Sequence, residues 1–333
     1  MNYDKIPGFA KPSYVALYIK YEITSPVDGT LIQHTVKKPE HIEPMITRTG
    51  DAFILIPTMR RAALFIITLL VFAVLGILSA SAQDIDNTME EDPVNNSISY
   101  AELSKQLVEA VRDGDPHFMY TRMLASVPED ELYQNLATES EKKAFWINIY
   151  NAYVQILLLE DPELFVNRNS WFGYNFFSSP QITIAGKELS FDDIEHGIMR
   201  RSKIKLSLGY LNQWFVDNFV ERFWWDEIDP RIHFVLNCGA ASCPYIAPFD
   251  PDRVEEQLRL GAKEHLENTT DYSAEENDVE VTRLISWFRG DFGGVSGAIE
   301  MIKSYGIIPQ ESEPSVNFKE YDWTLELGNY KEL

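Results

Sequence analysis

The feature that most constrains the fold is one long helix with almost no polar face. The sequence "TESEKKAFWINIYNAYVQILLLE" spans residues 138–160. Thr138 and Glu141 form a capping box at its start, and Pro162 follows its end. From Ala144 to Leu159 the side chains are apolar nearly all round the helix, which is typical of a helix buried on every side. The rest of the domain is therefore expected to pack around it.

Three amides interrupt this apolar surface. Asn148, Asn151 and Gln155 form an uncharged stripe about 60° wide when each residue turns the helix by about 100°. A stripe facing solvent would usually carry lysine or glutamate, whereas an amide donates and accepts hydrogen bonds without a net charge. The stripe either lines a cleft or holds a neighbouring catalytic loop, or it simply satisfies the backbone of an adjacent strand.

A targeting segment divides the chain. Two arginines precede the apolar run Ala62 to Leu78, and a small-residue cleavage site follows. We predict a signal peptide at residues 59–82, cleaved after Ala82, and an exported protein that is periplasmic or extracellular. The alternative is an uncleaved signal anchor in the membrane. Residues 1–58 are then an upstream, mis-started segment or a cytosolic tail, and residues 83–99 are a flexible leader.

The charge of the exported part excludes some partners. Residues 83–333 carry 21 basic and 45 acidic side chains, a net charge of −24. This balance argues against nucleic acid and against a polybasic patch that docks on anionic lipid. We expect contact with a membrane only through residues 59–82, if they stay uncleaved. The sequence has no Gly-rich phosphate loop, and we expect no cofactor and no metal.

The patterns beyond residue 100 predict a single, helix-rich α+β domain over residues 100–333, with a small, mostly antiparallel sheet. Helices are expected at residues 251–266 and 296–305. A hairpin is expected at residues 181–190 with its turn at Gly186, and strands at residues 231–237 and 321–327. A papain-like or transglutaminase-like version of this fold class is one hypothesis.

A second helix, "SFDDIEHGIMRR", begins at Ser190. A helical wheel places Glu195 within its apolar arc and His196 on the opposite, exposed side. We therefore expect Glu195 to be at least partly buried, and His196 to lie on the surface. A buried carboxylate can orient a histidine or act as a general base. It can also form a structural ion pair with an arginine, for example Arg231.

Both cysteines of the chain lie in one segment, "IHFVLNCGAASCP" at residues 232–244. Four interpretations are open. Cys238 and Cys243 form a disulfide, as expected of an exported protein, or they are two packed free thiols. Cys238 is a nucleophile with His233 as its base and Glu195 or an asparagine as the orienting group. The least favoured is a metal site, because zinc usually needs closer spacing and further ligands. In a strand, His233 and Cys238 would lie on opposite faces.

Three blocks of sequence resemble a known family. The blocks "FWINIYNA", "LSFDDIEHGIMR" and "DPRIHFVLNCGAASCP", in this order, are similar to the signature blocks of the DUF547 family. "YDWTLEL" resembles its closing block, which more often reads YDWSLN, so Thr324 and Glu326 depart from the pattern. The resemblance covers about residues 142–327. The family is a domain of unknown function, found in bacteria, often behind a signal peptide, and in plants. The resemblance therefore implies no reaction, cofactor or catalytic residue.

Two functional hypotheses follow, beside the possibility that all three blocks serve only the core. The first is a thiol-dependent hydrolase or acyl transferase acting on peptide material of the cell envelope. Its candidate residues are Cys238, His233, Glu195, Asn148 and Asn151, which should converge on one cleft. Plant members often replace the second cysteine and the histidine, which favours Cys238 over Cys243. The alternative is a non-catalytic module that binds envelope glycan or peptide on aromatic side chains, namely the loop at residues 170–177 with Trp214, Trp224 and Trp225.

Overall fold

The computed structural model describes residues 19–24, 31–36, 99–166, 168 and 175–333. The predicted signal peptide at residues 59–82, its cleavage after Ala82, the leader before residue 99 and most of residues 1–58 lie outside the described residues. Within residues 1–58, β1 (Ile19–Thr24) pairs antiparallel with β2 (Leu31–Val36). This hairpin belongs to a separate unit, because residues from Glu91 onward form a compact unit of their own.

The second unit is an α+β fold rich in helix, which confirms the predicted class. Groups of helices alternate with short strands along this unit. The strands form two small sheets, one of β3 and β4 and one of β5, β6 and β7 in that order. The β6–β7 pair is parallel and the other pairs are antiparallel. No helix among the described residues is long and apolar enough to cross a membrane. The helices are α2 (Tyr100–Asp113), α3 (Phe118–Ser126), α4 (Glu129–Asn135), α5 (Glu139–Glu160), α6 (Glu163–Val166), η1 (Asp193–Met199), α7 (Asn218–Arg222), η2 (Pro230–Phe234), α8 (Val254–Thr269), α9 (Arg283–Trp287) and α10 (Val295–Ser304). The strands are β3 (Ile182–Ile184), β4 (Lys187–Leu189), β5 (Asp271–Ser273), β6 (Asp278–Val281) and β7 (Ser315–Phe318).

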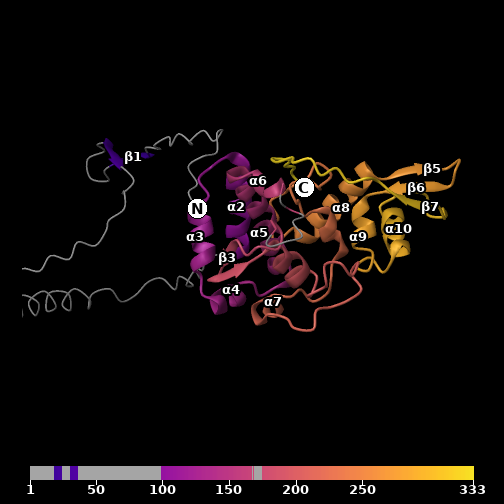
Figure 1. Ribbon diagram of the computed structural model, residues 1–333, viewed down its shortest axis with the longest axis horizontal. Helices are drawn as coiled ribbons and strands as arrows, with labels where there is room; N and C mark the ends of the chain where they lie inside the picture. Colours follow the sequence, from indigo (N-terminus) through magenta and orange to yellow (C-terminus); the bar gives the residue numbers. More distant parts are fainter. Residues whose placement is uncertain (1–18, 25–30, 37–98, 167, 169–174) are drawn as a thin grey trace, which may run out of the picture. The chain divides into compact units, whose positions relative to one another are not determined.

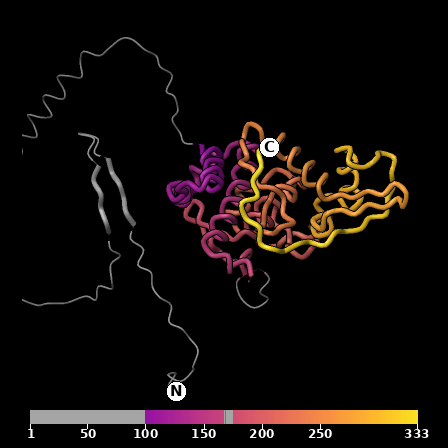
Figure 2. Tube along the Cα trace, turned by 90° about the horizontal axis from the view of Figure 1, so that it is seen from above, coloured from indigo at the N-terminus to yellow at the C-terminus, as the bar shows by residue number. Residues whose placement is uncertain are grey.

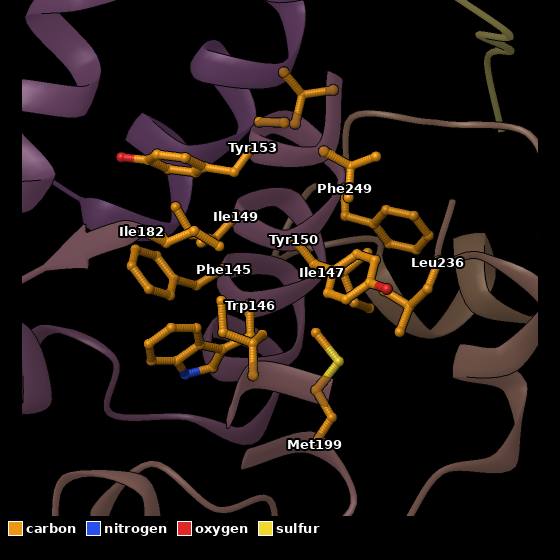
Figure 3. Close-up of a cluster of buried hydrophobic side chains, with 14 of the residues drawn as sticks. Phe145, Trp146, Ile147, Ile149, Tyr150, Tyr153, Ile182, Met199, Leu236 and Phe249 are labelled. Atoms are coloured by element: carbon orange, nitrogen blue, oxygen red, sulfur yellow. The ribbon is translucent and has the colours of Figure 1, made fainter. Parts of the chain in front are cut away.

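Helix α5 is the centre of the unit, as its all-round apolar surface predicts. The capping box of Thr138 and Glu141 opens it. In Figure 1 it lies between α2, α3 and α4 on one side and α8, α9 and α10 on the other. Phe145 and Ile147, both labelled in Figure 3, lie about 200° apart round this helix, and both are fully buried. Trp146 packs edge-to-face against Phe223 at 5.5 Å between ring centroids. Burial on both sides explains why α5 has no solvent-facing stripe.

Two apolar clusters form the core, and two segments connect them. The larger surrounds α5, and the smaller lies between α8, α9, α10 and β6. The short helix η2 contributes Phe234 to the smaller cluster and Ile232 to the larger. The C-terminal segment, residues 319–333, runs back from β7 across the unit (Figure 2), and Tyr321 packs against both clusters.

Two predicted strands are wrong. Residues 231–237 do not form a strand, because Pro230–Phe234 is the 3-10 helix η2. The side chain of Asp229 accepts a hydrogen bond from the Arg231 N–H, and Pro230 occupies the first helical turn, so helix-starting chemistry prevails over a β-rich composition. Residues 321–327 are extended but make only one bridge, between Leu325 and Ala240. The hairpin turning at Gly186 and the helices at α8 and α10 confirm the other predictions.

The helix after Ser190 has an unusual winding, and the prediction that His196 lies on its exposed side is wrong. Asp193–Met199 is a π-helix, in which the Arg200 N–H donates to the Glu195 carbonyl, 3.0 Å away and five residues back. Ile194 and His196, two residues apart, lie on opposite sides of the helix in either winding, but the Arg200 guanidinium and the Phe288 ring cover the side of His196. His196 is only 4% exposed instead of lying on the surface. Glu195 is largely buried, as predicted, with 15% of its side chain exposed.

Candidate functional site

A cavity of about 370 Å³ collects most of the predicted site residues. Cys238, His233 and Glu195 all line it, although a strand would have kept the first two apart. Asn148 and Asn151 do not line it. Among the described residues no group of three or more His, Cys, Asp and Glu side chains is placed to hold a metal ion. The other polar and aromatic lining residues include Tyr150, Phe177, Asp192, His196, Lys205, Trp287, Phe288, Tyr321 and Trp323.

The two asparagines hold the segment that carries the cysteines. The Asn151 Nδ2–H donates to the Val235 carbonyl at 3.0 Å, and the Asn237 N–H donates to Asn151 Oδ1 at 2.9 Å. Asn148 makes the same pair of bonds with the backbone of Phe249, at 2.8 Å each. Both side-chain amides therefore form hydrogen bonds with buried backbone groups, as one of the interpretations expected. The backbone they bind is the loop after η2, and it is not a strand. The two clamps lie on either side of Cys238 and Cys243.

Replacing Asn151 with alanine is expected to lower the free energy of unfolding by about 3 kcal/mol, because a buried carbonyl and a buried N–H lose their partners. Urea denaturation measures the change. The matched control is Asn317→Ala, since the Asn317 amide contacts only an exposed carboxylate of Asp278, and its cost should stay below about 1 kcal/mol. Equal costs for the two variants would contradict the clamp.

The two cysteine sulfurs lie at disulfide distance, with 6.2 Å between their Cα atoms. Of the four interpretations, this distance favours the disulfide. Cys238 is half-buried and lines the cavity, whereas Cys243 is 6% exposed and lines a second cavity of about 270 Å³. The Tyr321 hydroxyl lies 3.5 Å from Cys238 Sγ and 3.2 Å from Cys243 Sγ. Because Tyr321 also lines both cavities, it stands with the disulfide between them.

A buried polar network lies behind His233. Its Nε2 is 2.8 Å from Asp291 Oδ2, and the same carboxylate accepts two bonds from the Arg200 guanidinium, at 2.6 and 3.2 Å. Arg200 also donates to His196 Nδ1 at 2.6 Å. The side chains of Arg200 and Asp291 are fully buried, and the His233 side chain is 1% exposed. The His233 ring stacks on Phe288 at 3.8 Å between centroids.

The network fixes the charge states of its members. Burial lowers the pKa of His233 to about 4, so the imidazole is neutral at pH 7. Burial alone would raise the pKa of Asp291, but bonds from His233 and Arg200 lower it, so the carboxylate is ionised. An ionised carboxylate only accepts, so His233 Nε2 carries the proton and Nδ1 is the proton acceptor of the ring. Burial, with Arg200 beside it, lowers the pKa of His196 well below its usual value.

Glu195 has a different partner from the arginine that was considered. Arg231 binds Asp229 and Glu255, and the Tyr150 hydroxyl donates to Glu195 Oε2 at 3.2 Å. Burial raises the pKa of Glu195. The group that orients His233 is Asp291 and not Glu195. Sequence reasoning missed Asp291, which lies in "RGDFGG", where only the flanking glycines signal a backbone packed closely against another segment.

Of the aromatic residues predicted for a binding surface, Phe177 lines the cavity, whereas Trp214, Trp224 and Trp225 do not. Trp225 is fully buried, and Trp224 donates through Nε1 to the Gly197 carbonyl. Residues 170–174 lie outside the described part of the chain. Trp287, Tyr321 and Trp323 form the aromatic wall instead, with ring centroids 4.7 to 5.8 Å apart. They come from α9 and the C-terminal segment.

The fold and the cavity define an α+β domain with a cysteine pair, a histidine held by a buried carboxylate and an aromatic wall around one pocket. The family model described as "Protein of unknown function, DUF547" matches residues 133–266. This match confirms the resemblance to the DUF547 family over residues 133–266. Comparison with curated proteins and with solved structures gives no match.

Proposed function

We propose that this protein, in its reduced form, is a cysteine-dependent hydrolase or acyl transferase acting on peptide material of the cell envelope. The observation that carries the proposal is that Cys238 and His233 line one cavity while Asp291 holds the far nitrogen of the histidine. A nucleophile, a base and a group that orients the base are the parts that acyl transfer through a side chain needs.

The first step is reduction, because the sulfur of Cys238 is bonded to Cys243. A dithiol reductant cleaves the S–S bond, is itself oxidised to a disulfide, and leaves two thiols on the protein. His233 Nδ1 then takes the proton of the Cys238 thiol, since the thiolate is the reactive form. The buried imidazole is neutral at pH 7 and so free to accept a proton. Burial weakens it as a base, whereas its bond to the Asp291 carboxylate favours the protonated form.

The thiolate sulfur then attacks the carbonyl carbon of the peptide. The C–N bond breaks, the amine leaves with the proton from His233, and the acyl group stays on Cys238 as a thioester. Water releases the acid in a hydrolase, and an amine takes the acyl group in a transferase. Burial raises the pKa of Tyr321, so its hydroxyl stays protonated 3.5 Å from the sulfur and can donate to developing negative charge.

Two single-cysteine variants of the full chain test the proposal, because the chain has two cysteines. Cys243→Ser should leave Cys238 to react with iodoacetamide at pH 7, with an inflection below the ordinary thiol pKa of about 8.5. An activated peptide ester should add one acyl group to it, detected by mass spectrometry. The matched variant Cys238→Ser leaves only the buried Cys243 and should give no adduct. An adduct on Cys243 alone, or on neither variant, would contradict the mechanism.

A second candidate is a non-catalytic binding module, favoured by the aromatic wall of Trp287, Tyr321 and Trp323. Such rings stack on the apolar faces of sugars and on peptide side chains. On this view the disulfide is permanent and no adduct forms. Binding of envelope glycan or peptide by the oxidised protein, lost in Trp287→Ala, would support this candidate over the enzyme.

A further inference from the structure

One loop carries most of the exposed apolar surface of the second unit. Seven of the thirteen large apolar side chains that are exposed among the described residues lie between residues 204 and 215. Trp214 and Phe215 are each 92% exposed and Leu206 is 85% exposed. We call residues 203–215 the apolar loop. Soluble proteins rarely gather so many large apolar side chains at one exposed place without a partner.

The exposure does not come from a lack of local structure. The Ile204 N–H donates to the Leu211 carbonyl at 2.9 Å, and the Gln213 N–H donates to the Ser202 carbonyl at 2.7 Å, so the loop is a hairpin-like projection. Gly209 has a φ of +89°, and a Cβ there would lie 2.4 Å from Asp291 Oδ1. The turn of the apolar loop, at Leu208 and Gly209, thus packs directly on the buried network, while Trp214 and Phe215 project from its end.

The charge around the apolar loop differs from that of the rest of the chain. Residues 197–216 contain no acidic side chain. Residues 83–333 contain 45 acidic side chains among 251 residues, so a stretch of twenty residues would be expected to contain three or four acidic side chains. The cations nearby are Arg201, Lys203 and Lys205. Lys205 pairs with Asp192, and Lys203 has no carboxylate partner among the residues that the structure describes. The apolar loop itself therefore carries no negative charge, and the neighbouring carboxylates of Asp192 and Asp217 are each paired with a lysine.

We propose that the apolar loop docks on an anionic lipid bilayer, which adds a second membrane contact to the one expected through residues 59–82. Tryptophan and lysine beside long apolar side chains are typical of segments that lie in a membrane interface, where the rings enter the headgroup region and the cations meet anionic lipids. A lipid surface also accepts projecting side chains without a matching pocket. Acid-free sequence at this one place removes the repulsion that the whole-chain charge would otherwise impose.

The position of the loop connects the docking surface with the cavity. Lys205, Leu206 and Leu208 line the cavity of Cys238 and His233 as well as belonging to the apolar loop. A bilayer bound to the loop therefore lies at the edge of the cavity. Substrate attached to the envelope membrane would reach the cavity from that side. If the proposed function holds, the substrate is therefore peptide material anchored in that membrane. The docking itself does not depend on the proposed function.

Tryptophan quenching tests the docking on the full chain. All seven tryptophans follow residue 145, so brominated lipid reports on this unit whatever residues 1–98 do. Vesicles of brominated phosphatidylglycerol with phosphatidylcholine should quench the emission of the wild type, and Trp214→Phe should lose most of that quenching. The matched control, Trp224→Phe, removes a half-buried ring and should keep it. Similar quenching of the wild type and Trp214→Phe would overturn the proposal.

A charge change tests the choice of lipid. Lys203→Glu should weaken quenching by the anionic vesicles severalfold, whereas Lys263→Glu, at an exposed ion pair on α8, should not. Equal quenching by vesicles of brominated phosphatidylcholine alone would overturn the anionic surface. A dimer in vesicle-free solution that dissociates on Trp214→Phe would overturn the bilayer in favour of a second copy of the chain. None of these measurements requires enzymatic activity. A result that contradicts membrane docking can therefore be distinguished from one that contradicts the thiol mechanism.

Discussion

Replacing Asp291 with alanine is expected to lower the free energy of unfolding by about 3–5 kcal/mol. The Asp291 carboxylate and the Arg200 guanidinium are both fully buried, and removal of one leaves the other charge without compensation. His233 would lose its hydrogen-bond partner at the same time. Urea denaturation of the full chain, followed by circular dichroism, measures the loss.

Two further variants show whether the charge is responsible. Asp291→Asn keeps the shape of the side chain but removes its charge, so it should lose most of the same stability. Glu267→Ala breaks an exposed pair with Lys263 on α8 and should cost less than about 1 kcal/mol. If Asp291→Ala proved as mild as Glu267→Ala, the buried network would not exist as described.

The second large effect is a loss of stability in mild acid. Burial lowers the pKa of both His233 and His265 to about 4, against about 6.5 in the unfolded chain. Between pH 6.5 and about 4, these two histidines are therefore protonated in the unfolded chain but neutral in the folded protein. The stability is fully present above pH 6.5 and is lost as the pH falls to about 4, by about 3 kcal/mol for each histidine. Urea denaturation at pH 7, 6, 5 and 4 should show this decline.

Variants assign the decline to its groups. His265→Phe keeps an aromatic ring against Phe234 but cannot take a proton. Between pH 7 and pH 4, the free energy of unfolding of this variant should fall by about 3 kcal/mol less than that of the wild type. Glu195 acts in the opposite direction, because its raised pKa adds stability as the pH falls, so Glu195→Gln should steepen the decline. Curves parallel to that of the wild type would contradict both assignments.

The sequence predicted the fold where one local pattern decided the structure. The capping box at Thr138 and the apolar surface of α5 are such cases, because burial all round leaves a helix no other position than the centre. The two strands at residues 231–237 and 321–327 failed for different reasons. At η2 the Asp229-Pro230 start outweighed the β-branched and aromatic side chains. The last segment is extended, but only contacts with distant residues decide whether extended backbone pairs in a sheet.

The candidate site was predictable in part. Cys238, His233 and Glu195 were identified by chemical type, and they line one cavity. Asp291 was not, because it lies 58 residues after His233 and nothing local links the two. His196 was misplaced because a helical wheel shows only which side of a helix is polar, and the distant Phe288 ring and the Arg200 guanidinium bury that side in the fold. The aromatic wall was missed because Trp287 and Trp323 meet only in the folded chain.

The C-terminal segment has a consequence for how the cavity can change shape. Leu325 and Tyr330 bridge to the cysteine-bearing loop at Ala240 and Ile246, and Tyr321 rests on both apolar clusters. A hinge movement that separates the clusters must therefore peel this segment away from the loop. Widening the pocket in this way would therefore also remove part of the backbone support of the cysteines, and the Asn148 and Asn151 clamps would then hold the loop alone.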